Sequence, residues 1–315
     1  MYMKMLVKIG FILFLICFAS CNTDKIYTEE QYKNVVYLLS GSENIYTESY
    51  TLNDAAPVKY FSVVCGGTRP NDKEVTVTIV PDLDMFHAYN RRNFDSESLY
   101  AKLLPESRYQ IASYTATIPA NPTDQYVKVP VRVNPHGLSP DSVYFIPLTI
   151  KSVSRYEVNE NKNNMLYRVT IENDYARQKV ATYYAMRGVE TNRSNNAETM
   201  LSGAKLVQPL TKNKVRMFAG NYTQGRESTV ADIQRLAMVV EIKEDNTIDI
   251  TPYGSMQVVT IRDNPLYNIY DPKAIEWIIE QRTMYLHYRY RVMNNNGIYG
   301  DWQEVKEILV RIEED

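Results

Sequence analysis

In residues 283–292, Thr-Met-Tyr-Leu-His-Tyr-Arg-Tyr-Arg-Val, apolar or aromatic side chains alternate with mostly polar and charged ones. Successive side chains of a β-strand point to opposite faces, so this run predicts a strand with one buried face and one solvated face. The buried set is Met284, Leu286, Tyr288, Tyr290 and Val292, and the solvated set is Tyr285, His287, Arg289 and Arg291.

The segments around this strand predict an antiparallel barrel or a second sandwich in the second half of the chain. Residues 294–297 form a turn signal, and residues 302–312 supply a returning strand. Asp271-Pro272-Lys273 offers a helix N-cap followed by proline, which predicts a short helix through Trp277. Further strands are predicted at 180–186, 204–208, 215–219, 236–243, 247–251 and 257–261, with a hairpin at Glu244-Asp245-Asn246.

The first half shows the same strand and turn chemistry, with short runs of Val, Ile, Tyr and Thr between turn residues. This spacing is typical of an immunoglobulin-like sandwich. Two helices are predicted at 83–90 and 96–104, the second beginning after Ser96 and ending at Pro105. The predicted strands are 35–39, 58–64, 75–80, 114–118, 126–133, 143–150 and 167–171.

Alternation weakens and charge rises at 173–179, which indicates a domain boundary. We therefore expect an all-β protein with a sandwich domain at 35–172 and, at 180–315, an antiparallel barrel or a second sandwich. Two domains of this size can each bury a core of their own.

The N-terminus carries the signals of a bacterial lipoprotein. Lys4 and Lys8 precede an uncharged apolar run at 9–19, which is too short to span a bilayer, and Phe18-Ala19-Ser20-Cys21 follows. We expect residues 1–20 to be a signal peptide and Cys21 to be lipidated, with 21–34 as a polar tether. These signals predict a lipoprotein anchored to a membrane.

Charge and cysteine usage exclude several classes. Loss of Lys4 and Lys8 with the leader changes the formal charge from −2 to −4, and no basic cluster predicts a nucleic-acid partner. Beyond the leader and Cys21 there is one cysteine, Cys65, so no intrachain disulfide can form. Cys65 shares a strand face with Phe61 and Val63, which predicts a buried structural thiol.

Motifs for catalysis and cofactors are missing from the sequence. His87, His136 and His287 have no second histidine or cysteine at zinc-ligand spacing, and there is no EF-hand loop, GxSxG elbow, P-loop or GxGxxG. We predict no cofactor and no metal. Glycoside hydrolysis needs two facing carboxylates, and the chain has 37 acidic residues, so a hydrolase stays an alternative.

Tyrosine outnumbers phenylalanine 26 to 8. A tyrosine ring offers a flat apolar face and a hydroxyl, a combination that suits a sugar ring, although tyrosine is also a common strand residue. The polar loop at 294–301 presents an aromatic pair to one end of the barrel. The candidate ligand residues are Trp302, Tyr299, Tyr270, Tyr267 and Trp277, with burial as the alternative role for each.

The first half resembles the N-terminal domain of unknown function in Bacteroides-type surface lipoproteins of glycan-utilisation loci, a module also fused to some endo-beta-N-acetylglucosaminidases. The matching residues cover 21 to about 172, counting the lipobox at Cys21. They are Leu103-Leu104-Pro105 leading to Tyr109, Ile118-Pro119-Ala120, and Tyr144-Phe145-Ile146-Pro147-Leu148 followed by Lys151-Ser152-Val153-Ser154.

The second half resembles the companion domain of that module, on the residues Tyr285 to Tyr290, Trp302 and the terminal strand. This resemblance implies a calycin-like antiparallel barrel at 180–315. The two resemblances together imply an outer-membrane accessory lipoprotein beside a glycan importer, predicted to face the cell surface, with the periplasmic face as the alternative. With the excess of tyrosine they predict a non-catalytic protein that binds oligosaccharides or polysaccharides. The glycosidases with this module carry a DGxDxDxE-type motif, whereas Asp82-Leu83-Asp84 here lacks the following glutamate, and too few residues follow 179 for a (β/α)8 barrel. A structural or protein-interaction lipoprotein is the alternative.

Overall fold

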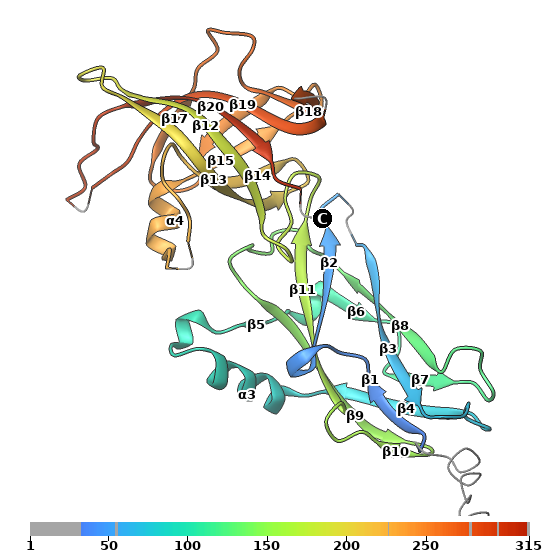
Figure 1. Cartoon of the computed structure of the whole chain (residues 1–315). Coiled ribbons are helices and arrows are strands. Elements are labelled where there is room, and N and C mark those ends of the chain that lie inside the picture. The colour runs from blue at the N-terminus through green and yellow to red at the C-terminus, as the bar shows by residue number, and fades with distance from the viewer. Residues whose placement is uncertain (1–32, 54–55, 226, 277–278, 295, 314–315) are drawn as a thin grey trace, which may run out of the picture.

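The computed structural model describes residues 33–53, 56–225, 227–276, 279–294 and 296–313. The predicted signal peptide, Cys21, nearly all of the tether and Trp277 lie outside these residues. The described chain is all-β, with two curled sheets in the first half and a nearly closed antiparallel barrel in the second half, as the sequence predicted (Figure 1). None of the described helices is both long and apolar enough to cross a bilayer.

The described part of the first half folds into a five-stranded and a six-stranded sheet. The first contains, in spatial order, β10 (Glu157–Val158), β1 (Val35–Leu38), β3 (Val58–Gly66), β8 (Tyr126–Val133) and β6 (Tyr109–Ile111). The second contains β2 (Ile45–Thr51), β11 (Asn164–Glu172), β9 (Tyr144–Val153), β4 (Val75–Pro81) and β7 (Thr115–Ile118), and β5 (Lys102–Leu103) pairs with β9.

One hydrophobic core joins the two sheets, which is the packing of a sandwich. Cys65 lies in this core and is 0% exposed, so the predicted structural thiol is confirmed. Burial raises the pKa of that thiol. The hydroxyls of Tyr50 and Tyr167 share a 2.6 Å hydrogen bond in the same core, and burial raises the pKa of both phenols.

One of the two helices predicted in the first half is confirmed. α3 (Leu83–Asn93) begins after Asp82, whose side chain accepts a 3.0 Å hydrogen bond from the Met85 amide. The helix predicted at 96–104 is wrong, because this segment contains a short 3-10 turn (Glu97–Leu99) and then β5. Asn90 binds both backbone groups of Ala101 and holds the segment extended beside β9.

The second half forms a nine-stranded sheet within the described residues. Its spatial order is β16 (Ile248–Pro252), β15 (Ala237–Ile242), β14 (Lys214–Phe218), β13 (Glu198–Thr211), β12 (Thr182–Asn192), β20 (Gln303–Arg311), β19 (Ile279–Arg291) and β17 (Gln257–Thr260), with β18 (Ile269–Glu276) also paired to β19. The hairpin predicted at 244–246 is confirmed by the antiparallel pairing of β15 with β16.

The two ends of this sheet meet through side chains, which nearly closes the barrel. The Thr260 hydroxyl accepts from the Ile250 amide (3.0 Å) and donates to the Ile250 carbonyl (3.2 Å). Arg262 donates to the Ile248 carbonyl at 3.1 Å and binds the Asp249 carboxylate. The Thr260 side chain thus makes the two hydrogen bonds to Ile250 that a neighbouring strand's backbone would otherwise make, at the point where β16 and β17 meet.

The helix predicted from Asp271 through Trp277 is wrong. Residues 269–276 form β18, which pairs antiparallel with β19 and has a register shift between Asp271 and Ala274. Proline is tolerated in a strand where the ladder is interrupted, so Pro272 ends no element here. The barrel has a helix that the sequence reasoning missed, α4 (Val230–Leu236), which starts with a capping box between Thr229 and Asp232.

Candidate ligand-binding face of the barrel

Three neighbouring strands build one exposed face of the barrel. β20 lies between β12 and β19, and the register places Arg289 and Thr191 on either side of Glu304. His287 and Val189 likewise flank Lys306. We call this surface the outer face. Its residues are Arg187, Val189 and Thr191 of β12, Trp302 just before β20, Glu304, Lys306 and Ile308 of β20, and Tyr285, His287, Arg289 and Arg291 of β19.

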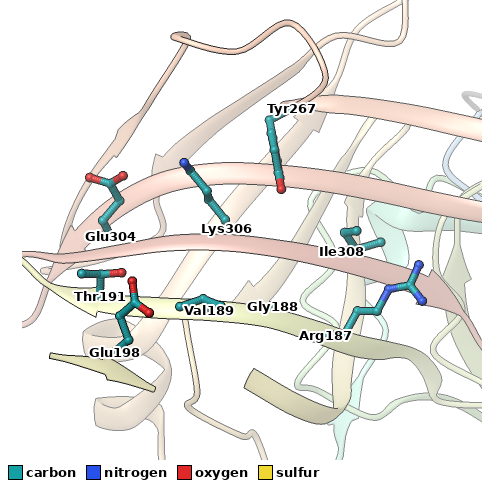
Figure 2. Close-up of a pocket in the computed structure, with 9 residues that line it drawn as sticks. All are labelled: Arg187, Gly188, Val189, Thr191, Glu198, Tyr267, Glu304, Lys306 and Ile308. Carbon is teal, nitrogen blue, oxygen red and sulfur yellow. The ribbon is translucent and has the colours of Figure 1, made fainter. Parts of the chain in front are cut away.

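A pocket of about 380 Å³ lies on the outer face. Figure 2 shows Tyr267, from the loop between β17 and β18, standing over the strands beside Lys306, while Glu304, Thr191 and Glu198 gather at one end. Gly188 belongs to the lining, and a Cβ atom there would lie 2.1 Å from the Lys306 carbonyl oxygen. Glycine therefore allows β12 and β20 to approach closely at this point.

His287 is at the centre of this arrangement and is 0% exposed, although the alternation predicted it on the solvated face. Its Nε2 lies 3.0 Å from Glu304 Oε1 and can share a proton with it. Its Nδ1 lies 2.9 Å from Asp263 Oδ1 but is outside hydrogen-bond geometry. The Tyr267 ring covers the imidazole edge-on, with ring centroids 5.7 Å apart. The outer face is therefore partly roofed by the loop at 261–268.

Asn268 fixes that loop to β19. Its side-chain oxygen accepts from the His287 amide (3.0 Å), and its Nδ2 donates to the His287 carbonyl (3.0 Å) and the Ile261 carbonyl (2.6 Å). Asn268 is 1% exposed and has a φ of 55°, a conformation that asparagine tolerates better than most residues. The position of Tyr267 over the pocket is thus set by a buried amide.

Beside the pocket, aromatic rings and guanidiniums form a second cluster. The guanidinium carbon of Arg289 lies 5.0 Å from the Trp302 ring centroid, and that of Arg291 lies 4.7 Å from the same centroid. Arg291 is also 4.9 Å from the Tyr299 ring, and its Nε donates to Gln257 Oε1 at 2.8 Å. We call these four residues, Arg289, Arg291, Tyr299 and Trp302, the guanidinium–aromatic cluster.

The structure places the sequence-predicted ligand residues in different environments. Trp302 and Tyr299 come together in the guanidinium–aromatic cluster, and Tyr267 lies over the pocket on the same outer face. Tyr270 is 8% exposed and packs edge-on against Tyr175, with centroids 5.1 Å apart. It belongs instead to a pocket of about 770 Å³ between the two halves of the chain. Trp277 is outside the described residues.

The barrel interior holds a polar network that the sequence reasoning missed. Lys205 Nζ lies 2.7 Å from Glu307 Oε2, and the Tyr288 hydroxyl donates to Glu307 Oε1 at 2.8 Å while accepting from the Gly220 amide at 2.8 Å. Burial raises the pKa of the Tyr288 phenol well above its ordinary value, and the neighbouring Glu307 carboxylate adds to this. Strand alternation places the side chains of Lys205 and Glu307 on the inward face of the barrel, and this alternation was the sequence signal from which the pair could have been found.

Gly220 makes this network compact. Its φ is +51°, and a Cβ atom at this position would lie 2.1 Å from Glu190 Oε2. Glu190 accepts from the Tyr290 hydroxyl (3.0 Å) and the Asn221 amide (3.3 Å). These side chains and the apolar core around them lie inside the barrel. Within the described residues, no three His, Cys, Asp or Glu side chains converge as metal ligands would.

Two family models match the chain. One, described as an N-terminal domain, matches residues 32–157, and the other, described as a C-terminal domain, matches residues 163–309. The chain belongs to this two-domain family. The match confirms the pairing of domains that the resemblance predicted. Among curated proteins, no sequence matches this one.

Solved structures share the fold along nearly their whole length. A protein of unknown function from Bacteroides ovatus has a TM-score of 0.63 at 15% identity, covering 89% of this family member and 98% of that chain. A multidomain protein from the same species has a TM-score of 0.61 at 15% identity, covering 88% of this family member and 94% of that chain. An auxiliary nutrient binding protein from Bacteroides thetaiotaomicron has a TM-score of 0.56 at 12% identity, covering 86% of this family member and 92% of that chain. At these identities the likeness concerns the fold.

Proposed function

We propose that this family member is a non-catalytic accessory lipoprotein that binds glycans through the outer face of its barrel. In this proposal Cys21 carries the lipid anchor in the outer membrane, and the folded part faces the cell surface beside a glycan importer. The observation that carries the proposal is the convergence of Trp302, Tyr299 and Tyr267 on one face, next to a pocket with polar walls.

Two further observations support this function. Sugar sites combine flat aromatic surfaces with side chains that both donate and accept hydrogen bonds, and the outer face supplies both through Tyr267, Thr191, Glu198 and Lys306. The fold is also similar to that of the auxiliary nutrient binding protein, which is the kind of role proposed for this chain. Because the polar side chains inside the barrel already bind one another, the exterior is the better surface for a ligand.

Substitution Trp302→Ala is expected to weaken glycan binding by about 1–3 kcal/mol, which is the usual cost of truncating an aromatic anchor. Trp302 is half-buried and contacts both Arg289 and Arg291, so its removal takes away a ring surface and the support of two guanidiniums. The measurement is retardation of residues 22–315 on affinity gels cast with host and plant polysaccharides, followed by calorimetry on the best ligand.

The matched control is Tyr60→Ala, which removes a 44% exposed aromatic ring from the other half of the chain. This variant is expected to bind like the wild type. Equal binding by Trp302→Ala with an unchanged unfolding midpoint would move the site away from the outer face. A wild-type protein that no polysaccharide retards would contradict glycan binding itself.

Substitution Cys21→Ala is expected to abolish lipid attachment and to release the protein from the membrane fraction. The physical reason is that Cys21 supplies the thiol for the lipid, and the following polar segment cannot hold a chain in a bilayer. Radiolabelled palmitate incorporation and membrane fractionation measure the outcome, with Cys17→Ala as the control that should stay anchored. Protease treatment of whole cells then tests the surface orientation.

A further inference from the structure

The guanidinium–aromatic cluster contains two positive charges that have no ion-pair partner among the described residues. Arg289 and Arg291 are two positions apart on one strand face, which separates their Cα atoms by about 7 Å. Arg289 is exposed, and Arg291 is half-buried with its Nε bound to the neutral side chain of Gln257. Both guanidiniums face the same indole ring rather than a carboxylate.

The nearest acid across the sheet is already engaged elsewhere. Glu304 is the cross-strand neighbour of Arg289, but its Oε1 lies 3.0 Å from His287 and its Oε2 lies 3.5 Å from Arg193 Nε. On the other side of β19, the register places the apolar Val259 beside Arg289. Asp301, which precedes Trp302, accepts a 3.4 Å hydrogen bond from Asn192. The sheet therefore leaves both guanidiniums without a counter-charge.

The aromatic rings hold these charges in place. A guanidinium that stacks on an aromatic face still points its N–H groups outward in its own plane, where they can bind another acceptor. The Tyr299 ring, on the other side of Arg291, is fixed by a 2.9 Å hydrogen bond from its hydroxyl to the Ser255 carbonyl. The two guanidiniums are thus held beside the Trp302 and Tyr299 rings before any ligand binds.

We infer that the outer face selects acidic saccharides, whose carboxylate groups bind Arg289 and Arg291 while the sugar ring lies against Trp302 and Tyr299. Carboxylates accept two parallel N–H bonds from a guanidinium, and such charge-assisted bonds are the stronger class. Lys306, exposed in the adjoining pocket, adds a third cation for a longer chain. This inference rests on the proposed glycan binding and specifies its substrate class.

The test uses two acidic polysaccharides, polygalacturonate and hyaluronan, each beside its carboxyl-reduced neutral form. Wild-type protein is expected to bind at least one acidic form about tenfold more tightly than the neutral form of the same chain. The double variant Arg289→Gln/Arg291→Gln is expected to lose about tenfold for the acidic form and to keep its affinity for the neutral one. The control Lys102→Gln/Lys151→Gln removes the same charge from exposed sites in the first half.

A second measurement keeps the inference testable if the arginine variant is unstable. Wild-type affinity for the acidic form is expected to fall as NaCl rises from low to physiological concentration, whereas affinity for the neutral form stays constant. Equal binding of acidic and neutral forms, or an effect of the control as large as that of the arginine variant, overturns the charge selection and leaves glycan binding standing. Absence of binding to any polysaccharide overturns both.

Discussion

Substitution Glu307→Ala is expected to lower the free energy of unfolding by about 3–5 kcal/mol, the usual cost of breaking a buried ion pair. The side chains of Lys205 and Glu307 are 2% and 0% exposed, and their 2.7 Å contact neutralises two charges inside the barrel. Without the carboxylate, a lysine ammonium stays in an apolar interior and the Tyr288 hydroxyl loses its acceptor. Urea unfolding followed by circular dichroism measures the change.

Two companion variants separate charge from shape. Glu307→Gln keeps the size of the side chain and an acceptor for Tyr288, yet it still leaves Lys205 unpaired, so most of the loss should remain. The double variant Lys205→Met/Glu307→Leu removes both charges, and most of the lost stability is expected to return because apolar replacements of a buried pair are often neutral or better. The remaining loss is that of the Tyr288 hydroxyl, which still lacks its acceptor. A Glu307→Gln protein as stable as the wild type would show that the ammonium does not depend on this carboxylate.

This buried pair also bears on where a ligand can bind. A lysine, a glutamate and several tyrosines already satisfy one another inside the barrel, with Gly220 donating its amide to Tyr288. A ligand entering there would have to replace bonds that are made without it. The outer face has the opposite character, because Arg289 and Lys306 carry exposed charges that no described carboxylate neutralises. In the proposed function, the inward side chains of these strands contribute stability and the outward ones contribute binding.

Most of the strands could be predicted from the sequence because alternation is a local property. β8 was predicted at 126–133 and observed as Tyr126–Val133. The strand predicted at 283–292 overlaps β19 at every residue except Val292. In both strands, the apolar side chains face the core and most of the polar ones face solvent. A register of this kind is specified strongly, since a shift by one residue would expose the whole apolar set.

Elements that depend on distant partners could not be predicted in this way. β2 (Ile45–Thr51) is polar and mostly half-buried, and it is a strand because it pairs in parallel with β11, more than a hundred residues later. The segment at 269–276 carries local helix signals, but its pairing with β19 outweighs them. Local propensity is a weak prior wherever a sheet edge offers a full set of hydrogen bonds.

The candidate site was predictable in its residue types and not in its geometry. The alternation placed Arg289 and Arg291 on the solvated face, and the loop after β19 pointed to Tyr299 and Trp302. The stacking of the guanidiniums on Trp302 follows from the register between β19 and β20, which no local pattern contains. The burial of His287 likewise depends on Asp263 and Tyr267, which belong to a separate loop.

Substitution Asp141→Ala is expected to lower the free energy of unfolding by about 3 kcal/mol and to loosen the contact between the two halves of the chain. The Arg216 side chain of the barrel is 0% exposed, and its NH1 donates to Asp141 Oδ2 of the first half at 2.7 Å. Gln208 also accepts from this guanidinium, so part of its hydrogen bonding survives the substitution. We therefore expect a loss of unfolding free energy at the low end of the roughly 3–5 kcal/mol range for breaking a buried ion pair.

Solvent exposure decides how much such a pair contributes, and Glu157→Ala supplies the matched comparison. Glu157 pairs with Lys33 at 3.0 Å, but these side chains are 69% and 75% exposed, so its loss should cost less than about 1 kcal/mol. Hydrogen exchange should rise at 173–180 in Asp141→Ala alone, because Gln178 in that segment also binds the Pro140 and Ser142 carbonyls next to Asp141. Equal costs for the two variants would mean that Arg216 stays hydrated and that the two halves are held together without this pair.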